Sequence, residues 1–433
     1  MMGPFFPGEE WDSNVMDVAG DKKVIISHPE LVVPAGDLER LYMAVHYGAD
    51  AVYVGGADLN LRAYVPGFSV KELEDCVQVA HRAGVKVYVA LNIFAHNHHL
   101  EEAVTCIERM ASLGVDALII SDPGILQLAQ RIAPQVPVHL STQAGVTNRE
   151  SARFWKERGC RRLILARELS LEEIREIRKK VDVELEVFVH GAMCLAYSGR
   201  CILSSYFTGR GANRGECTQP CRWNYILAEE NRLDDPLLIA EEGCGSYILS
   251  SRDLNMIEHI PELVDAGIDG FKIEGRMKGV HYVATVTRVY REAIDQYLNR
   301  SEGPTSDLDW KEELTKVSHR PYHTGFYFGR PEQVDPTSKE RYRQRCTLAA
   351  VVRGYDRKEG MAFVEQRNHF LRGEELEAFG PSGKPYRFKV EKIFDLSGNE
   401  LDAAPHPRQQ LHIPVPGEKL APLDILRKYL PAT

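Results

Sequence analysis

The feature that most constrains the fold is a repeated alternation of short apolar runs with longer amphipathic segments, which begins at Glu30. Such alternation is typical of βα units, in which helices connect the parallel strands of one sheet. No G-x-G-x-x-G follows the first run, so an open sheet that binds a dinucleotide is not indicated. The apolar runs predict eight strands, at 31–33, 51–55, 86–91, 117–121, 138–141, 162–166, 184–190 and 270–273.

The amphipathic segments between these runs have the spacing of helices that cover a sheet. Ser170, with Glu173 three residues later, forms a capping box at the start of one of them. Eight strands with helices between them predict an α/β fold of the (β/α)8, or TIM-like, barrel type, with a closing helix in 278–299. Other helices are expected at 38–49, 71–84, 99–114, 150–159 and 170–180.

The pattern divides the chain into parts. We expect a flexible N-terminal tail at 1–28 and the barrel at 29–300. Residues 191–245, after the seventh strand, are far longer than a usual loop, so we interpret them as a Cys-rich insertion over the barrel mouth. Short β-rich runs from 345 to 433, broken by Gly, Pro and Asn, predict a small C-terminal β-barrel domain, and 301–344 would connect it to the barrel.

The composition limits the class of protein. A chain of 433 residues with 44% hydrophobic and 27% charged residues is typical of globular proteins. It contains no run of about 18 apolar residues, so no membrane association is expected. The acidic start lacks a secretory signal, and nine cysteines without one favour a reducing compartment, the cytoplasm. The net charge of -9 argues against non-specific nucleic-acid binding by the whole surface but allows a local basic groove.

Four of the nine cysteines lie in one stretch, with the spacing C-x6-C-x15-C-x3-C. Converging thiolates suit tetrahedral zinc or an iron–sulfur cluster. Structural zinc usually uses two C-x2-4-C pairs, and only the last pair has that form, so the spacing favours a cluster. The predicted ligands are Cys194, Cys201, Cys217 and Cys221, and Cys244 could replace Cys221. Core positions are expected for Cys76, Cys106, Cys160 and Cys346.

Polar side chains follow most of the predicted strands, at the end that carries the active site in this type of barrel. Other polar candidates come from the FAHNHHL loop and from the cysteine stretch. His96, His98 and His99 could instead indicate a second metal, although adjacent loop histidines are more often merely polar. The candidate substrate-binding residues are Asn92, His96, Gln143, Arg167, Arg200 and Glu274.

The candidate catalytic residues occupy alternate positions of their strands, so their side chains are expected to point into the barrel. His190 shares parity with Glu186 and is expected to point into the barrel mouth, the alternative being a satisfied core histidine. Lys272, Glu274 and Arg276 share parity on the eighth strand, and they could bind an anion or form structural ion pairs. Both alternatives stay open here. The candidates are His190, Glu186, Lys272 and Arg276.

Known protease machinery is hard to find in the chain. It has neither a G-x-S-x-G elbow nor an H-E-x-x-H zinc motif. A nucleophilic cysteine would need a depressed pKa rather than three thiol neighbours.

The residues from Glu186 to Ser204 carry a recognisable signature, E-x-F-x2-G-A-M-C-x4-G-x-C-x-L-S. Together with PAGDLERLYMAVHYGADAVYVGG, HLSTQAGVTN and FKIEGRMK, this stretch resembles the peptidase U32 family, the collagenase-like proteases. The resemblance covers roughly residues 30–430 and is specific at family level. It implies the barrel fold that the strand pattern also predicts.

Within the family, the segment GECTQPCRW and the C-terminal β domain resemble the prephenate-dependent tRNA uridine hydroxylases. The resemblance implies hydroxylation of the wobble uridine in the tRNA anticodon loop to 5-hydroxyuridine, with prephenate as cosubstrate. It also implies a 4Fe-4S cluster, which by position falls on the four cysteines above, with Cys244 as an alternative fourth ligand. A partner subunit of the same family is a further candidate partner.

Other classes of function remain as alternatives. The family's name suggests a peptidase, and relatives hydroxylate ribosomal RNA or a quinone precursor. A third alternative is a non-catalytic RNA-binding protein with a structural metal such as zinc, which the appended β domain would suit.

Overall fold

The computed structural model describes residues 28–55, 68–194, 196–210, 217–223, 240–241, 244–245, 252–299, 308–329, 342–415 and 420–431. The predicted N-terminal tail, except His28, lies outside the described residues, as do parts of the predicted insertion and connector. Among the helices of the described residues, none combines the length and the apolar character needed to cross a membrane.

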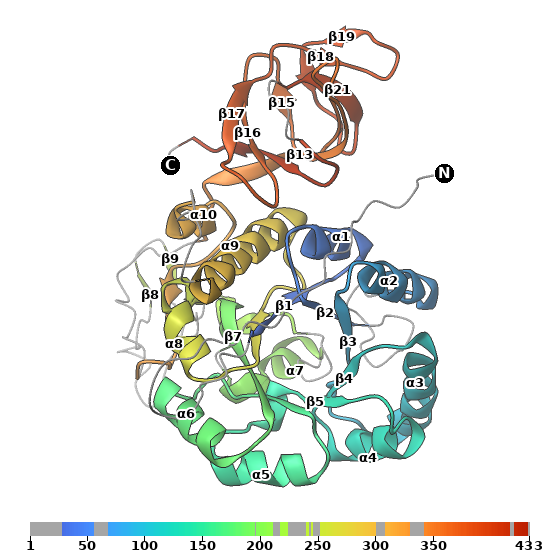
Figure 1. Ribbon diagram of the computed structural model, residues 1–433, viewed down its shortest axis with the longest axis vertical. Coiled ribbons are helices and arrows are strands. Elements are labelled where there is room, and N and C mark those ends of the chain that lie inside the picture. The colour runs from blue at the N-terminus through green and yellow to red at the C-terminus, as the bar shows by residue number, and fades with distance from the viewer. Residues whose placement is uncertain are drawn as a thin grey trace, which may run out of the picture.

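Eight parallel strands close into a barrel, because the last of them pairs with both the first and the seventh. This confirms the predicted TIM-like barrel, and each predicted strand is present within a few residues (Figure 1). The barrel strands are β1 (Glu30–Pro34), β2 (Ala51–Val54), β3 (Lys86–Ala90), β4 (Ala117–Ile120), β5 (Val138–Leu140), β6 (Arg162–Ile164), β7 (Glu184–Ala192) and β11 (Gly270–Ile273).

Helices surround the barrel and bury apolar side chains against it, and α9 (Val280–Leu298) is buried over most of its length (Figure 1). The capping box of Ser170 and Glu173 is present, and Ser69 with Glu72 forms a second one. Each box satisfies otherwise unpaired backbone N–H groups at a helix start. The helices are α1 (Leu38–His46), α2 (Val70–Arg82), α3 (Leu100–Leu113), α4 (Pro123–Ile132), α5 (Arg149–Glu157), α6 (Leu171–Lys180), α8 (Ile260–Asp265) and α9 (Val280–Leu298).

Two short strands that the sequence did not indicate extend the sheet beyond β7. Strand β10 (Asp253–Asn255) pairs antiparallel with the end of β7, and β12 (Tyr322–His323) pairs with β10. The buried ion pair of Asp253 with Arg320, 2.9 Å long, holds this extension in place. Strands this short show no alternation of apolar and polar residues, so they could not be predicted from the sequence.

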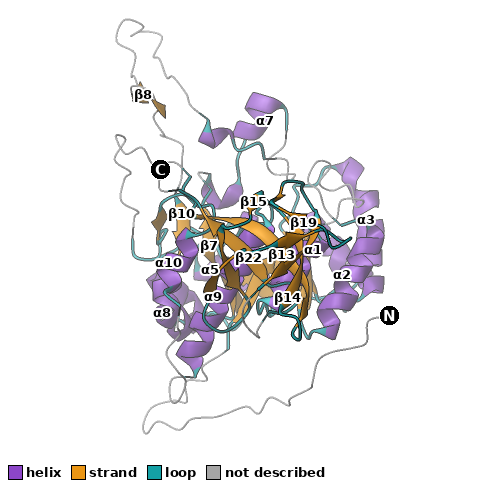
Figure 2. Cartoon of the chain, turned by 90° about the horizontal axis from the view of Figure 1, so that it is seen from above, coloured by secondary structure: helices purple, strands orange, loops and turns teal. Residues whose placement is uncertain are grey.

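The insertion after β7 contributes short elements at one end of the barrel, where α7 projects (Figure 2). Its described elements are η3 (Tyr197–Gly199), α7 (Leu203–Thr208), η5 (Pro220–Arg222), β8 (Ala240–Glu241) and β9 (Cys244–Gly245).

The C-terminal part is a separate antiparallel sheet that curves into a half-barrel, in line with the predicted small β domain (Figure 1). Its main strands are β13 (Cys346–Asp356), β14 (Met361–Gln366), β16 (Glu375–Phe379), β17 (Tyr386–Lys389), β18 (Ile393–Phe394), β19 (Glu400–Leu401), β21 (Gln410–Pro414) and β22 (Ile425–Tyr429). Strands β15 (Phe370–Leu371) and β20 (Ala403–Ala404) form a second, two-stranded sheet.

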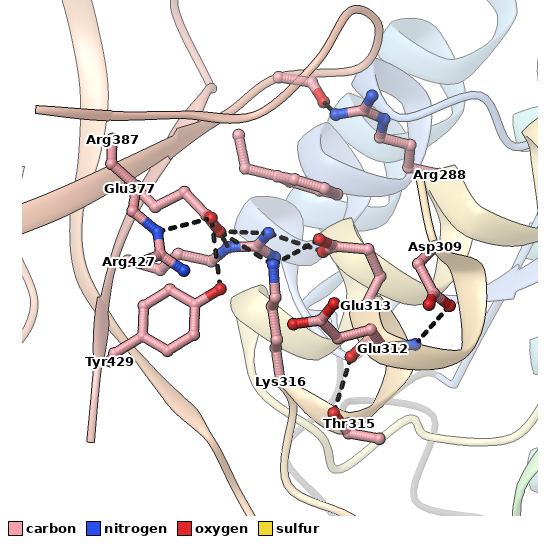
Figure 3. Close-up of polar contacts among 12 residues, drawn as sticks. Arg288, Asp309, Glu312, Glu313, Thr315, Lys316, Glu377, Arg387, Arg427 and Tyr429 are labelled. Atoms are coloured by element: carbon pink, nitrogen blue, oxygen red, sulfur yellow. Dashed lines mark hydrogen bonds and ion pairs between the residues drawn. The ribbon is translucent and has the colours of Figure 1, made fainter. Parts of the chain in front are cut away.

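The half-barrel packs against α1, α9 and α10 (Trp310–Thr315), where Val351, Phe379 and Ile425 join the buried apolar cluster of the barrel. An ion cluster lies at the same junction (Figure 3). Arg427 of β22 binds Glu313 of α10 and Glu377 of β16, each at 2.6 Å. The two domains therefore share one core and one buried set of charges.

Candidate active site at the barrel mouth

A pocket of about 300 Å³ lies at the carboxyl ends of the barrel strands. Side chains that follow β3, β5, β6, β7 and β11 line it, as expected for the active-site face of such a barrel. The pocket brings together many side chains predicted from the sequence: Asn92, Gln143, Arg167, Lys272, Glu274, Arg276, Cys194, Cys217 and Cys221.

Two aromatic side chains that the sequence did not single out also line the pocket. The Tyr53 hydroxyl donates to the carbonyl oxygen of Ile273 at 3.0 Å. Phe188 lies under the Arg167 guanidinium, whose Cζ is 3.9 Å from the ring centroid. Strand parity could have found Phe188, because it shares a face with the inward-pointing Glu186.

Glu186 and Lys272 form a buried ion pair deeper in the barrel, with 2.7 Å between Oε1 and Nζ. Arg162 Nη1 lies 3.2 Å from the other Glu186 oxygen. Burial acts to raise the pKa of Glu186, but the two cations outweigh it and lower that pKa below its usual value. The sequence left two alternatives open for Lys272, anion binding or a structural ion pair. The contact with Glu186 shows that Lys272 forms the structural ion pair. Glu186 is fully buried and does not line the pocket.

The predicted orientation of His190 requires a correction. Its side chain is 1% exposed and lies outside the pocket lining, with ring centroids 5.4 Å from Tyr290 and 5.3 Å from Tyr322. A bulge is the reason: the β7–β11 register shifts, so that Val189 is an extra residue in β7 and the simple alternation fails. Desolvation lowers the pKa of His190 to about 3, so its ring is neutral at pH 7. His190 is therefore a core histidine whose ring nitrogens lie near the hydroxyls of Tyr290 and Tyr322, which is the alternative stated above.

The pocket holds two arginines with different surroundings. Arg167 is paired: Nη2 lies 3.1 Å from Glu274 Oε2, and Nη1 donates to the carbonyl oxygen of Ala192 at 2.9 Å. The Arg276 side chain makes no hydrogen bond or ion pair with any residue that the structure describes. Desolvation lowers the pKa of the Arg276 guanidinium. Tyr53 and Glu274 act on the guanidinium electrostatically and oppose this effect. A partly buried cation that makes no hydrogen bond or ion pair with a described residue is suited to bind an anion.

Two glycines allow Arg276 to occupy this place. A Cβ on Gly55 would lie 2.5 Å from Arg276 Nη1, and a Cβ on Gly36 would lie 2.4 Å from the Arg276 carbonyl oxygen. At Gly36 the clash would be with backbone, so glycine is required there by the close approach of Arg276. At Gly55 a larger residue would instead displace the guanidinium from its present position.

Carboxamides form another part of the pocket wall. Gln143 Oε1 is buried and, among the described residues, has no hydrogen-bond partner. Asn92 Nδ2 donates to Ser141 Oγ at 3.3 Å. An unpaired buried acceptor costs free energy, so an N–H donor on a ligand would be favoured beside Gln143.

Side-chain hydrogen bonds attach the cysteine stretch to the barrel rim. Glu168 accepts hydrogen bonds from the backbone N–H and the hydroxyl of Ser198, both at 2.7 Å. Arg200 donates to the carbonyl oxygens of Gln143 and Ala144, at 2.7 and 3.0 Å. Arg200, predicted to bind substrate, lies outside the pocket lining and here fixes the segment between Cys194 and Cys201.

Hydroxyl groups connect the two halves of the cysteine stretch. Ser204 Oγ lies 3.0 Å from Thr218 Oγ1 and also accepts from the Thr218 backbone N–H at 3.0 Å. Thr208 donates to the carbonyl oxygen of Ser204 at 2.7 Å. These bonds hold α7 against the segment that carries Cys217 and Cys221.

The thiols gather at the mouth but do not form a ready metal site. Cys201 lies outside the pocket lining, yet it and Cys221 act electrostatically on Cys194. Desolvation raises the pKa of the Cys194 thiol. In the described part of the chain, no three His, Cys, Asp or Glu side chains form a group that could hold a metal ion. The side chain of Cys244 lies outside the described residues.

The chemistry of the donor set nevertheless suits a thiolate-bound cluster. All four cysteines are free of disulfides. The Gln219 backbone N–H donates to Cys217 Sγ at 3.4 Å, and the Ala196 backbone bonds to Cys194. Hydrogen bonds to the sulfurs are among the features that tune iron–sulfur clusters.

The histidine loop contributes nothing to this pocket. His96 is exposed, and its ring lies 5.7 Å from that of His98 and 5.8 Å from that of His99. None of the three lines the pocket, and they form no metal-binding group.

Fold and site define a class: TIM-like barrels whose mouth carries a Cys-rich insertion and whose chain continues into a β domain. The chain belongs to the peptidase U32 family. Residues 36–336 match Peptidase family U32, and residues 344–427 match the Peptidase family U32 C-terminal domain. The resemblance that the signature implied is therefore confirmed.

Relatives in this family carry different names. The chain is 42% identical to tRNA hydroxylation protein P1 of Bacillus subtilis, over 96% of this chain and 99% of the relative. It is 36% identical to tRNA hydroxylation protein P of Escherichia coli, over 90% and 94%. A protein of Porphyromonas gingivalis named Collagenase is 32% identical, over 92% and 97%.

Proposed function

We propose that the protein is an RNA-modifying hydroxylase, and that it converts the wobble uridine of tRNA to 5-hydroxyuridine with prephenate as cosubstrate. The observation that carries the proposal is that thiols, carboxamides and Arg276, which makes no hydrogen bond or ion pair with a described residue, line one pocket. The names of the Bacillus subtilis and Escherichia coli relatives, which align over nearly their whole length, support tRNA as the substrate.

The pocket volume suits one base rather than a helix. About 300 Å³ lies at the small end of the range for ligand pockets, roughly 300 to 1,000 Å³. Enzymes that act on a base take it out of the stack, and the bases of an anticodon loop are accessible in this way. The imide edge of uracil offers an N–H between two carbonyl oxygens, which complements the free Gln143 Oε1 and a neighbouring carboxamide N–H.

Arg276 is the proposed anchor for the cosubstrate. Prephenate carries two carboxylates, and a guanidinium binds a carboxylate through two parallel hydrogen bonds. Arg167 already binds Glu274, so it supplies less free charge to the pocket. Arg276 would hold the cosubstrate at the β11 side, opposite the carboxamides that follow β3 and β5.

Cys194, Cys201, Cys217 and Cys221 would hold a 4Fe-4S cluster, with Cys244 as the alternative fourth ligand and zinc as the alternative metal. When bound, such a cluster supplies one-electron redox chemistry or a Lewis-acidic iron. The residues of the chain orient the thiols: Ser198 through Glu168, Arg200 through two carbonyl oxygens, and Ser204 through Thr218.

Peptidase activity is the second candidate, because one relative is named Collagenase. The site offers it little support. A cysteine nucleophile needs a depressed pKa, whereas desolvation raises the pKa of Cys194, and the neutral His190 lies outside the lining. Gelatin cleavage by the wild-type protein that is absent from a Cys194→Ala variant would restore this candidate.

The proposal is tested by mass spectrometry of nucleosides from the bulk tRNA of a strain that lacks the gene. We expect 5-hydroxyuridine derivatives to disappear. Wild type should restore them and Cys194→Ala should not, while Cys76→Ala, which removes a buried thiol of α2, should restore them. Unchanged tRNA in the deletion strain would reject the tRNA substrate and direct the search to ribosomal RNA or a quinone precursor. Restoration by Cys194→Ala would reject the role of the thiol.

A further inference from the structure

Large apolar side chains are unusually exposed in the cysteine stretch. Tyr206 is 80% exposed and Ile202 is 74% exposed, and three aromatic residues of the same stretch are exposed as well. We call this surface the aromatic rim; it consists of Tyr197, Ile202, Tyr206, Phe207 and Trp223. Contiguous exposed apolar surface of this kind usually marks a binding site.

The aromatic rim is held in place beside the pocket. The rings of Tyr206 and Phe207 are 5.3 Å apart, and those of Phe207 and Trp223 are 6.3 Å apart. The bonds of Ser204 with Thr218 fix α7, which carries Tyr206, next to the segment of the pocket-lining Cys217. Helix α7 projects at one end of the barrel (Figure 2). The rings therefore lie on the same segment as the pocket-lining Cys217 and Cys221 or on the helix bonded to it.

The charge of the same stretch differs in sign from that of the whole chain. Residues 194–223 contain four arginines and one glutamate, whereas the chain has a net charge of -9. Arg200 and Arg210 are exposed there. A positive surface with aromatic rings complements a strand that has a phosphate backbone and unpaired bases.

We infer that the aromatic rim stacks on unpaired bases of an RNA strand that flank the nucleotide in the pocket, while the exposed Arg200 and Arg210 contact the phosphates. The inference rests on the proposed function for its substrate class. Stacking on aromatic rings tolerates any base, so the rim would supply affinity and leave the choice of base to the pocket.

The inference is tested by binding of a fluorescent single-stranded oligouridine to the full-length protein, purified without oxygen. Tyr206→Ala should weaken binding roughly tenfold, since one base stacked on a ring contributes about one factor of ten. Tyr206→Trp should retain the affinity, and Tyr206→Leu should lose it, because stacking needs a π face rather than apolar area alone. Tyr42→Ala removes an exposed tyrosine of α1 and should have no effect.

Double-stranded RNA of the same length provides the second arm. Its bases are already stacked, so Tyr206→Ala should leave its affinity unchanged. Wild-type affinity of Tyr206→Ala for oligouridine would overturn the inference, and so would an equal loss for duplex RNA or for Tyr42→Ala. A dimer that Tyr206→Ala converts to a monomer would also overturn it, by assigning the rim to contacts between copies of the chain.

The test is independent of the reaction. Tyr206 is mostly exposed, so its variants should unfold at the wild-type temperature, which a melting curve checks. If tRNA nucleosides are unchanged in the deletion strain while Tyr206→Ala still loses oligouridine, the proposed substrate is wrong and the rim remains an RNA-binding surface. The opposite pair of results rejects the rim alone.

Discussion

The domain junction and the barrel mouth use the same kinds of side chains under different conditions. At the junction, the Arg427 side chain is 0% exposed and binds two carboxylates, those of Glu313 and Glu377. At the mouth, the Arg276 side chain makes no hydrogen bond or ion pair with a described residue, and the charge of Glu274 acts on it without such a contact. Burial of a charge is costly unless it is paired, so the paired arginine belongs to the scaffold and the unpaired one remains available for a ligand.

Lys272 shows that position alone does not separate the two roles. It lines the pocket, but its ammonium group binds Glu186 and lies 4.3 Å from the Tyr53 ring centroid. By its contacts it resembles Lys316 of the junction, which binds Glu377 at 3.2 Å. Pairing, rather than residue type or location, therefore distinguishes scaffold from site in this barrel.

The largest expected effect follows from breaking the junction. Arg427→Met would leave the carboxylates of Glu313 and Glu377 buried with one cation fewer (Figure 3). Loss of one partner from a buried ion cluster costs about 3–5 kcal/mol. Urea unfolding of the full chain should show this loss.

Arg372→Met is the matched control for Arg427→Met. It removes an arginine of the same domain whose ion pair with Glu400 is exposed, and it should cost less than about 1 kcal/mol. Equal losses for the two variants would mean that the junction cluster contributes no more than a surface pair.

The second effect concerns pH. His281 of α9 is buried near Arg427 and Lys316, and desolvation together with these cations lowers its pKa to about 3. An unfolded histidine has a pKa near 6.5, so between about pH 6.5 and 3 the unfolded chain binds the additional proton. The stabilising contribution is present above pH 6.5 and is lost as the pH falls through this window, by about 2 kcal/mol from pH 7 to 5.

His281→Leu should remove this part of the pH dependence, because the buried Nε2 has no hydrogen-bond partner among the described residues. The free energy of unfolding in urea at pH 7 and pH 5 measures it. His406→Leu, which removes an exposed histidine of the C-terminal domain, is measured beside it as the control for loss of a histidine. A slope that His281→Leu does not change would show that the histidine is solvated at the junction.

The sequence predicted the barrel well because its signals are local. Most residues of the barrel strands are apolar and buried, and polar residues such as Asn92 and Arg167 follow the carboxyl ends of the strands. The predicted orientation of His190 was wrong, because one extra residue in β7, Val189, shifts the alternation of side chains. This bulge is visible only in the pairing of β7 with β11. The ion pairs of the junction could not be predicted from the sequence either. Glu313, Glu377 and Arg427 are far apart in the chain, and no periodicity connects them.

The same limit applies at the pocket. Lys272 and Arg276 look equivalent in FKIEGRMK, because both are cations at the same parity. Only tertiary contacts separate them: Glu186 reaches Lys272 from β7, while the two glycines after β1 and β2 leave Arg276 its space. The sequence left anion binding and structural pairing open for both residues. Lys272 forms a structural pair, whereas Arg276 remains the candidate for anion binding.

The smallest expected effect on stability belongs to Arg276→Met. Glu274, the carboxylate whose charge acts on Arg276, keeps its ion pair with Arg167, so the free energy of unfolding should stay within about 1 kcal/mol of wild type. Prephenate binding should nevertheless weaken at least tenfold, because a charge-assisted bidentate contact contributes about 1.5–3 kcal/mol. Calorimetric titration with prephenate measures this, and Arg276→Lys should be intermediate, since lysine keeps the charge without the fork geometry.

If Arg276→Met were as unstable as Arg427→Met, the guanidinium would have a structural partner and the contrast between mouth and junction would fail. If stability and prephenate affinity were both unchanged, the contrast would stand but the cosubstrate would bind elsewhere.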